Sequence, residues 1–358
     1  MYKTLVTLPR ATAIAGSNIA FVKYWGNLDD TLNVPMNGSI SMTLDAAHTI
    51  TTVEFHPDLP ADELTINGQP ADWAAVKRAS AHLDRIRDLA RKYWSARIIS
   101  TNSFPTGAGI ASSASGFAAL TLAATKVLGL NLSKSELSRI ARLGSGSASR
   151  SIDGGFVEWQ PGGRHEDSYA TPLAPANHWD LVDIIAIIST EHKKVGSSMG
   201  HSLAHTSPFY QARLGTVQVM LQSVRRAIKE KNFTAFGKLI EEDAISLHVA
   251  AMSSRPSVLY WQPGTVALMQ ALRRWRDDGG PVGYFTMDAG PNVHVIAQRK
   301  HAAALQEKIL NVQGVQDTLF CGIGSAARII DSDLHPFGYG DSRVASLGKD
   351  TQNRLPTR

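Results

Sequence analysis

The hydrophobic residues of this chain recur with two spacings, and each spacing predicts one kind of secondary structure. Runs that are alternately or continuously apolar over a few residues predict β-strands, whereas apolar positions three and four residues apart predict α-helices. The predicted strands occupy residues 11–15, 18–24, 37–44, 51–55, 96–100, 156–159, 181–189 and 318–321, with two more around a tight turn in 281–295. The predicted helices occupy residues 72–94, 114–128, 137–143, 208–231, 233–253 and 265–278. Because helices and strands are mixed in both halves, the pattern predicts an α+β fold.

Turn and capping residues define several of these boundaries. Asn67-Gly68 is a tight-turn signal, and Ser133 and Glu136 have the spacing of a capping box for a helix that ends at Gly144. The helix at 72–94 is expected to bury one apolar face, which contains Val76, Leu83, Ile86 and Leu89.

The segment 102–117 joins a glycine- and serine-rich loop to a strongly apolar helix. Pro105 and Gly107 end the preceding strand, and Gly109 allows the backbone to approach a ligand closely. The segment 144–151 is a second glycine- and serine-rich stretch, which we expect to be a flexible loop rich in hydrogen-bond donors.

The first turn of the helix after the first loop contains Ser112, Ser113 and Ser115. Unpaired backbone N–H groups, several hydroxyls and the positive end of the helix dipole favour a phosphate group at this point. An ordinary serine N-cap would use the same residues, and the glycines are not followed by the Gly-Lys-Ser/Thr of a Walker A loop. The loop alone therefore leaves both interpretations open.

Three charged residues occupy positions where charge is uncommon. Lys23 lies in a strongly apolar strand, Arg150 lies in the second glycine- and serine-rich segment, and Asp288 lies at the tight turn between two strands. Arg150 could form a bidentate pair with a carboxylate or a phosphate. Each residue also has a structural explanation, namely a solvent-facing Lys23, a surface linker around Arg150 and support of the turn by Asp288.

Length and composition limit the class of protein. A chain of 358 residues is expected to form two domains, and 43% hydrophobic with 19% charged residues is typical of a soluble globular protein. No apolar run is long enough to cross a membrane, and the first residues do not resemble a secretory signal. We therefore expect a cytoplasmic protein without a membrane partner.

Cysteine content and charge exclude further classes. The single cysteine, Cys321, rules out an intrachain disulfide, and no Cys/His cluster has the spacing of a zinc site. The net charge of +5 is modest, and the basic residues are scattered among acids without a basic stripe interleaved with aromatic residues. Nucleic acid is therefore not an expected partner, and the positive charge suits an anionic small molecule equally well.

Four motifs occur in order along the chain: Asn18-Ile-Ala-Phe-Val-Lys23-Tyr24-Trp25-Gly26, Phe104-Pro-Thr-Gly-Ala-Gly-Ile-Ala-Ser-Ser-Ala, Gly144-Ser-Gly-Ser-Ala-Ser-Arg150-Ser and Asp288-Ala-Gly-Pro-Asn292. Together they resemble the motif set of the mevalonate diphosphate and phosphomevalonate decarboxylases of the GHMP kinase superfamily. The resemblance extends from about Pro9 to about Ile330, with the motifs in the right order.

The resemblance implies an architecture and a reaction. It implies an N-terminal domain similar to domain 2 of ribosomal protein S5 at 1–180, a ferredoxin-like C-terminal domain at 181–332 and a loosely held tail at 333–358. The active site would lie in the cleft between the domains. The family transfers the γ-phosphoryl group of ATP to the C3 hydroxyl of a phosphorylated mevalonate, and loss of phosphate and CO2 then gives the isopentenyl product. Relatives are often dimers, so a homodimer is compatible with the resemblance.

The resemblance also assigns roles to residues. Asp288 would take the proton of the C3 hydroxyl, Lys23 would keep Asp288 ionised and stabilise the transferring phosphoryl group, and Arg150 would grip the substrate carboxylate. ATP would be bound by the first glycine-rich loop and the start of the next helix, with Pro105, Gly107, Gly109, Ser112, Ser113 and Ser115. Mg2+ would be held mainly by phosphate oxygens and water, with a contact from Ser113. The substrate's terminal phosphate would be held by or close to Tyr24, Arg78, Ser145 and Ser147, and Ser197 matches a nearby serine segment.

One departure from the family motif affects the expected substrate. Many relatives have a lysine directly after Lys-Tyr-Trp-Gly, whereas this chain has Asn27. Loss of that cation should weaken binding of a diphosphate more than of a monophosphate. The hypothesis is a modest preference for mevalonate 5-phosphate, with mevalonate 5-diphosphate as the alternative.

Three other functions remain as rivals. They are a small-molecule kinase that does not decarboxylate, a non-catalytic protein that binds a phosphorylated ligand, and a basic nucleic-acid-binding module. The joint presence of a phosphate loop and acid-base candidates argues against a non-catalytic role.

Overall fold

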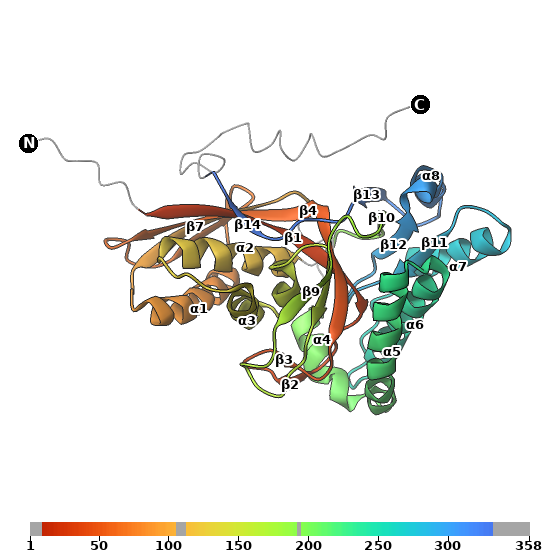
Figure 1. The fold of residues 1–358 in the computed structure, drawn as a ribbon, viewed down its shortest axis with the longest axis horizontal. Coiled ribbons are helices and arrows are strands. Elements are labelled where there is room, and N and C mark those ends of the chain that lie inside the picture. Colours follow the sequence, from red (N-terminus) through yellow and green to blue (C-terminus); the bar gives the residue numbers. More distant parts are fainter. Residues whose placement is uncertain (1–8, 105–111, 192–194, 332–358) are drawn as a thin grey trace, which may run out of the picture.

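The computed structural model describes residues 9–104, 112–191 and 195–331. The molecule is elongated, with one sheet and its helices in the first half and a smaller sheet with long helices in the second (Figure 1). Helices and strands are mixed in both halves, which confirms the predicted α+β class.

The first half is built on an eight-stranded sheet in the order β14-β1-β4-β7-β5-β6, with β8 beside β4 and β9 beside β8. Its strands are β1 (Arg10–Val22), β4 (Ser39–His56), β5 (Glu63–Ile66), β6 (Gln69–Pro70), β7 (Ser95–Asn102), β8 (Phe156–Trp159), β9 (Ala170–Ala174) and β14 (Arg328–Ile330). The helices α1 (Trp73–Ala90), α2 (Ser112–Val127) and α3 (Lys134–Gly144) lie on one face of this sheet (Figure 1). Apolar side chains from α2 and α3 pack there on Val53 and Ile98 of the sheet.

Two long strands replace four predicted short ones. The predicted break at Gly16-Ser17 is wrong, because β1 continues through it with a register shift against β4 between Gly16 and Asn18. A Cβ on Gly16 would lie 2.4 Å from the carbonyl oxygen of Leu44, so glycine allows the close approach of the two strands at the irregularity. The predicted strands at 37–44 and 51–55 are likewise parts of β4.

The local signals in this half are mostly confirmed. Asn67 and Gly68 both have positive φ in the turn between β5 and β6, and Ser133 and Glu136 form the predicted capping box. Leu89 is an exception, because its side chain is 57% exposed. The buried residues of α1 are instead Ala79, His82, Leu83, Ile86 and Arg87.

The segment 144–151 is ordered, contrary to the predicted flexible loop. Residues Gly146–Ser151 form the 3-10 helix η1, and most of them are buried. The Ser149 hydroxyl donates to the Gly146 carbonyl at 2.7 Å, and the Ser138 hydroxyl of α3 donates to the Ser149 carbonyl at 2.9 Å. The serines thus satisfy backbone acceptors locally, which lets a small-residue segment pack inside the protein.

The second half is a four-stranded antiparallel sheet covered by helices on both faces. The strands are β10 (Leu181–Ile187), β11 (Gly283–Thr286), β12 (Val293–Gln298) and β13 (Asp317–Cys321), in the order β11-β12-β10-β13. The helices are α4 (Ser197–Leu203), α5 (Tyr210–Glu230), α6 (Phe233–Met252), α7 (Pro263–Asp277) and α8 (Ala302–Leu310), with short 3-10 helices η2 (Ala204–Thr206) and η3 (Arg299–His301). The three long helices were predicted, whereas α4, α8, β9 and β14 were not.

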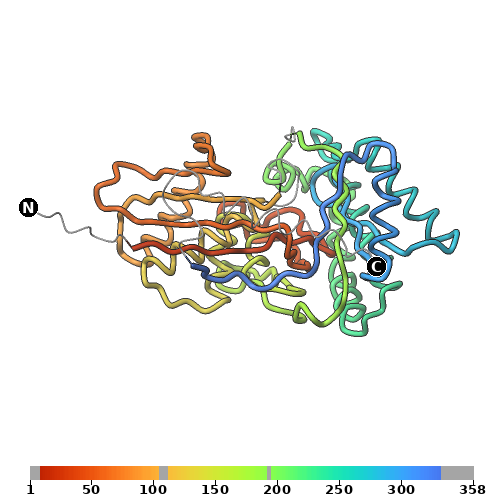
Figure 2. Tube along the Cα trace, turned by 90° about the horizontal axis from the view of Figure 1, so that it is seen from above, coloured from red at the N-terminus to blue at the C-terminus, as the bar shows by residue number. Residues whose placement is uncertain are grey.

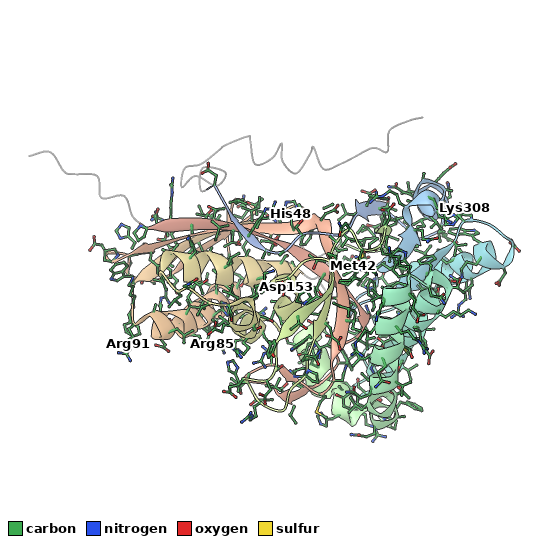
Figure 3. The ribbon with its side chains drawn as sticks, viewed as in Figure 1. Met42, His48, Arg85, Arg91, Asp153 and Lys308 are labelled. Atoms are coloured by element: carbon green, nitrogen blue, oxygen red, sulfur yellow. The ribbon has the colours of Figure 1, made fainter. Side chains whose placement is uncertain are left out.

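A shared hydrophobic core joins the two halves. Alternate residues of β10 face opposite ways, so that Ile184 packs with α7 and α8 while Ile185 packs with α5, α6 and the ends of β1 and β4. Phe21 of β1 meets Phe236 of α6 edge to face, with ring centroids 4.8 Å apart. Met42 of β4 belongs to this core and lies between the two halves in Figure 3, whereas Arg91 and Lys308 lie at opposite ends.

The last described strand returns to the first half. After β13 the chain runs back beside β1, where Thr12 pairs with Ile330, as the blue trace shows in Figure 2. The predicted second domain, 181–332, therefore includes one strand of the first sheet. The predicted first boundary, at 180, falls between β9 and β10, and residues 333–358 lie outside the described residues.

Candidate active site

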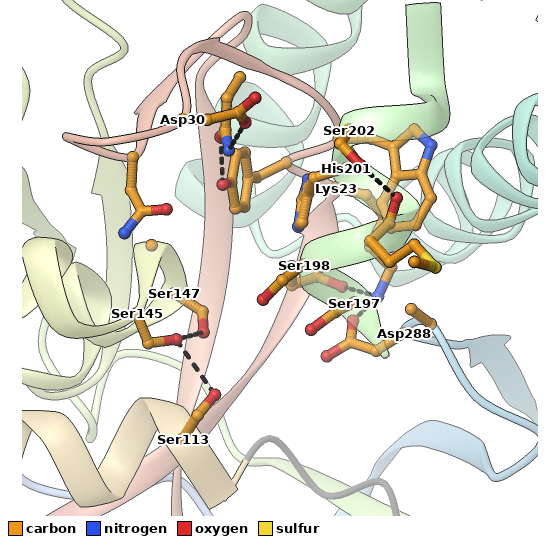
Figure 4. Close-up of a pocket in the computed structure, with 18 of the residues that line it drawn as sticks. Lys23, Asp30, Ser113, Ser145, Ser147, Ser197, Ser198, His201, Ser202 and Asp288 are labelled. Atoms are coloured by element: carbon orange, nitrogen blue, oxygen red, sulfur yellow. Dashed lines mark hydrogen bonds and ion pairs between the residues drawn. The ribbon is translucent and has the colours of Figure 1, made fainter. Parts of the chain in front are cut away.

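A cavity of about 680 Å³ opens between the two halves. Its walls come from the end of β1 and the residues after it, the start of α2, the junction of α3 with η1, α4, and the turn between β11 and β12. Figure 4 shows Ser113, Ser145 and Ser147 on one side and Ser197, Ser198 and Asp288 on the other. Eleven of the predicted site residues line it: Lys23, Tyr24, Asn27, Arg78, Ser112, Ser113, Ser145, Ser147, Arg150, Ser197 and Asp288.

Lys23 and Asp288 meet at one wall, although 265 residues separate them. The Lys23 Nζ donates to Asp288 Oδ1 at 2.8 Å and to the Ala20 carbonyl at 2.5 Å. The Lys23 side chain is 2% exposed, whereas that of Asp288 is 31% exposed and borders the cavity. The lysine is therefore a buried support, and the carboxylate is the group that a ligand can reach.

Burial and neighbouring charges act in opposite directions on this pair. Burial alone would raise the pKa of Asp288, but Lys23, His294 and Arg150 bring that pKa below its usual value. Burial lowers the pKa of Lys23, and the carboxylates of Asp288 and Asp243 offset part of that effect. Asp288 is therefore an ionised carboxylate beside a cation.

Arg150 extends from η1 into the same cavity and is held by neutral groups. Its guanidinium donates to Asn18 Oδ1 at 3.0 and 3.2 Å and to the Ser39 hydroxyl at 2.6 Å. Burial lowers the pKa of Arg150 to about 10, with Asp288 and Tyr24 opposing the shift, so the side chain stays charged at neutral pH. Within the described ranges no carboxylate forms an ion pair with Arg150, and a buried cation held this way can bind an anionic ligand.

The start of α2 faces the junction of α3 and η1. The Ser113 hydroxyl lies 3.1 Å from that of Ser145, which lies 3.4 Å from that of Ser147 (Figure 4). Ser115 does not line the cavity, because its side chain is buried and bonds the Thr49 hydroxyl at 2.7 Å. The predicted ATP-loop residues Pro105, Gly107 and Gly109 lie outside the described residues.

A chain of polar contacts forms a rim beside β2 (Asn27–Asp29), which pairs with β3 (Val34–Pro35). The Tyr24 hydroxyl donates to Asn27 Oδ1, and Asn27 Nδ2 donates to Asp30 Oδ1 at 2.7 Å. We call Tyr24, Asn27 and Asp30 the β2 rim. It combines a phenol, an amide and an exposed carboxylate, and it contains no cation.

His201 of α4 lies against this rim. Its ring stacks on that of Tyr24 at 4.0 Å between centroids, and its Nδ1 accepts the Gly26 backbone N–H at 3.0 Å. Burial and the charge of Arg150 lower the pKa of His201 to about 3. A neutral ring whose Nδ1 accepts must carry its proton on Nε2, so His201 has one N–H donor, and the residue lines the cavity.

Arg78 and Ser197 border the cavity more loosely. Arg78 is exposed on α1, donates to the Gly144 carbonyl at 3.3 Å and lies 5.2 Å from the Phe117 ring centroid. Ser197 is the first residue of α4. Ser197 and His201 are four residues apart and share a face of α4, but α4 was not predicted, so this spacing gave no signal for His201.

Two further features bear on the site. Within residues 9–104, 112–191 and 195–331, no group of three or more His, Cys, Asp or Glu side chains is arranged to hold a metal ion. A search of the same ranges finds no helix with the length and hydropathy that a membrane span requires.

Comparison with protein families gives two matches that together cover most of the chain. Residues 15–170 match the diphosphomevalonate decarboxylase-like N-terminal domain, and residues 183–327 match the mevalonate 5-diphosphate decarboxylase C-terminal domain.

Two curated relatives carry different substrate names. A diphosphomevalonate decarboxylase of Aspergillus fumigatus is 36% identical over 98% of this chain and 92% of its own length. A phosphomevalonate decarboxylase of Haloferax volcanii is 33% identical over 90% of this chain and 98% of its own length.

Two solved structures each cover 91% of this chain. The mevalonate diphosphate decarboxylase of Staphylococcus aureus is 39% identical, has a TM-score of 0.87, and covers 91% of this chain and 99% of its own. A structure of MDDEF in complex with MVAPP, AMPPCP and magnesium is also 39% identical, with a TM-score of 0.85 and coverage of 91% and 100%.

Proposed function

The chain belongs to the diphosphomevalonate decarboxylase family, and from that premise we propose how this ATP-dependent decarboxylase of the mevalonate pathway acts and which substrate it prefers. In the proposed reaction the γ-phosphoryl group of ATP passes to the C3 hydroxyl of a phosphorylated mevalonate. The C3–O bond then breaks as phosphate leaves. The C1–C2 bond breaks as CO2 leaves, and the electron pair of the C1–C2 bond forms the C2=C3 double bond. The proposed substrate is mevalonate 5-phosphate, and the product is isopentenyl phosphate.

The start of α2 suits the ATP phosphates. Ser112 and Ser113 present hydroxyls and first-turn N–H groups to the cavity, at the positive end of a helix of 16 residues. Mg2+ at nucleotide sites keeps several waters and binds substrate phosphates, so we propose that phosphate oxygens and water supply most of its ligands, with the Ser113 hydroxyl as the protein contact. When bound, Mg-ATP supplies the phosphoryl group, and the metal neutralises its charge.

Asp288 and Lys23 have the chemistry for the first step. The Asp288 carboxylate is ionised and borders the cavity, so it can orient the C3 hydroxyl and accept its proton as the phosphoryl group arrives. Lys23 donates to that carboxylate and adds positive charge beside the reacting atoms. The low pKa of Asp288 is compatible with this role, because phosphoryl transfer has a loose transition state that needs positioning more than strong basicity.

Arg150 has the chemistry for the second step. Its guanidinium is buried, charged and bonded only to Asn18 and Ser39 in the hydrogen bonds of the described residues. A bidentate pair with the substrate carboxylate would align the C1–C2 bond with the departing C3 phosphate. Ser145 and Ser147 would donate to the 5-phosphate at the neighbouring wall.

The observation that carries the substrate preference is the composition of the β2 rim. Asn27 occupies the position after Lys-Tyr-Trp-Gly, and its amide is bonded to the Asp30 carboxylate. A second phosphate at this end would meet an amide and an anion in place of an ammonium group. Because Asp30 is exposed and its charge is screened by solvent, we expect the resulting preference to be modest.

The test compares kcat/KM for mevalonate 5-phosphate and mevalonate 5-diphosphate at equal Mg-ATP. The wild type is expected to favour the monophosphate about three- to tenfold, and Asn27→Lys should move the ratio toward the diphosphate by about tenfold. Leu28→Lys is the matched control, because Leu28 is 58% exposed and does not line the cavity. A strong diphosphate preference in the wild type would make the diphosphate the substrate.

The rival kinase function predicts a different product. A kinase that does not decarboxylate would release ADP without CO2, whereas the proposed enzyme releases one CO2 for each ADP. Substrate labelled at C1 distinguishes the two, because its label leaves as CO2 only if decarboxylation occurs.

A further inference from the structure

The backbone of Lys23 is held by two charged side chains from the other half of the molecule. Lys23 follows Val22, the last residue of β1, so its backbone groups lie beyond the described strand. Its N–H donates to Asp243 Oδ2 at 2.7 Å, and its carbonyl accepts from Arg213 Nη2 at 3.0 Å. The same carbonyl also accepts from Asn37 Nδ2 at 3.0 Å, a partner from the first half. A buried backbone needs such partners, and here the ionic pair provides the acceptor for the N–H and one of the two donors to the carbonyl.

Arg213 and Asp243 are also paired with each other. Arg213 Nη2 lies 3.0 Å from Asp243 Oδ1, and its Nη1 donates to the Asp243 carbonyl at 3.3 Å. Arg213 belongs to α5 and Asp243 to α6, and they are 4% and 1% exposed. One end of the pair accepts and the other donates, so the pair is complementary to the two backbone groups of Lys23.

Stability alone does not explain this pair. Removing two charges from water costs free energy that their attraction often fails to recover, and apolar replacements of similar size are frequently neutral or stabilising. Arg213 Nε is in addition buried without a hydrogen-bond partner among the described residues, which adds to the cost. A pair of this kind is better explained by what it positions.

We propose that Arg213 and Asp243 are positioning residues that fix the backbone of Lys23, so that its Nζ meets Asp288 at the reacting atoms. The inference rests on the proposed role of Lys23. Lys23 lies on the first half of the chain and Asp288 on the second, and α5 and α6 belong to the second half as well. The pair thus sets the position of Lys23 relative to the carboxylate that it must reach.

Asp243 also contributes charge. The groups that face Lys23 are Asp288 from the turn after β11, Asp243 and His248 from α6, Arg213 from α5 and Arg150 from η1. Burial lowers the pKa of Lys23, Asp288 and Asp243 raise it, and Arg150 lowers it. Removing the Asp243 charge should therefore move the alkaline limb of the kcat profile to lower pH, because Lys23 acts as the protonated cation.

The main test replaces the pair by apolar residues, Arg213→Met with Asp243→Leu, so that no unpaired charge remains. A fall in kcat of about tenfold or more is expected, with the KM values for substrate and Mg-ATP within about threefold of wild type, because misplacement affects the reacting atoms more than binding. The matched control is Arg225→Met with Glu158→Leu. That pair joins α5 to β8 of the first half, through bonds of 2.6 and 2.9 Å, and it does not contact Lys23. The kcat of this control should therefore stay near that of wild type.

Asp243→Asn is the second variant and keeps an acceptor for the Lys23 N–H. This variant should retain most of its kcat at neutral pH, and the alkaline limb of its pH–kcat profile should move to lower pH. It serves as the test of the inference if the double variant does not fold. Unchanged kcat in a folded double variant, or loss of most of the kcat at neutral pH in Asp243→Asn, which keeps the acceptor, would overturn the inference. An unshifted limb in Asp243→Asn would overturn only the charge contribution of Asp243. Lys23→Met is measured alongside, because an active Lys23→Met would overturn the proposed role of Lys23 itself, a separate result.

Discussion

Two groups of residues that line the cavity, the charged residues and the β2 rim, hold their polar groups in different ways. Lys23, Asp288 and Arg150 are charged, and Lys23 and Arg150 are almost fully buried and bonded to partners from distant parts of the chain. The β2 rim is built from residues 24–30, whose contacts with one another are local, and its one charged member, Asp30, is exposed. Contacts within the rim can change without disturbing the buried charges. We therefore expect the charged residues to perform the reaction and the rim to set the substrate preference.

The largest effect should come from the charged residues. Asp288→Asn keeps an oxygen near Lys23 but removes the proton acceptor, so kcat should fall about 10³-fold while the Kd of a non-hydrolysable ATP analogue stays near that of wild type. Single-turnover assays and calorimetry measure the two quantities. A variant that retained a tenth of wild-type kcat would show that the reaction does not depend on this carboxylate.

Arg150→Gln should have the next largest effect and should separate the two steps. Loss of the cation for the substrate carboxylate is expected to lower CO2 release about 10²-fold and ADP release by less, so that the ADP to CO2 ratio rises above one. Parallel assays of ADP and CO2 measure this ratio. Equal losses in both would assign Arg150 to binding or to the first step.

His201→Phe should have a smaller effect, because the rim acts on binding. The phenylalanine keeps an aromatic ring against Tyr24 but removes the Nε2–H donor and the Nδ1 acceptor of the Gly26 N–H. The KM of the substrate should therefore rise about fivefold with little change in kcat. Burial lowers the pKa of His201 to about 3. The pH dependence of substrate KM should therefore show no inflection from this residue near neutral pH, either in the wild type or in His201→Phe. An inflection near the ordinary histidine pKa of about 6.5 that disappears in the variant would contradict a neutral donor.

Asp30→Asn should have the smallest effect of the series. Removing an exposed anion from the rim is expected to improve kcat/KM for the diphosphate relative to the monophosphate by about two- to threefold, and added salt should reduce the difference. An assay with both substrates present, run at two ionic strengths, measures the ratio of their kcat/KM values and its salt dependence. A larger effect than that of Asn27→Lys would mean that Asp30, and not the missing lysine, dominates selection.

The same contrast explains which features could be predicted from the sequence. Lys23, Arg150 and Asp288 lie in motifs that identify the family, and the structure brings all three to one cavity. Asp243 could not be found, because its role depends on a contact with a backbone group 220 residues away, and nothing near it in the sequence indicates that partner. Its place in a regular helix favours the simpler interpretation of a solvent-facing acid.

The fold was predicted where signals are local and missed where they depend on tertiary contacts. The capping box at Ser133 and the turn at Asn67 are properties of a few adjacent residues, and both are confirmed. The segment 144–151 has the composition of a flexible loop, but its serines bond backbone carbonyls and its Arg150 is fixed by Asn18 and Ser39. Strand β14 has only three residues and forms by pairing with β1, so periodicity could not reveal it.

The return of β14 to the first sheet means that two covalent links cross between the halves, one before β10 and one after β13. The links add to the shared core at the same junction, so separating the halves would break contacts such as that of Phe21 with Phe236 and would also extend the chain at both crossings.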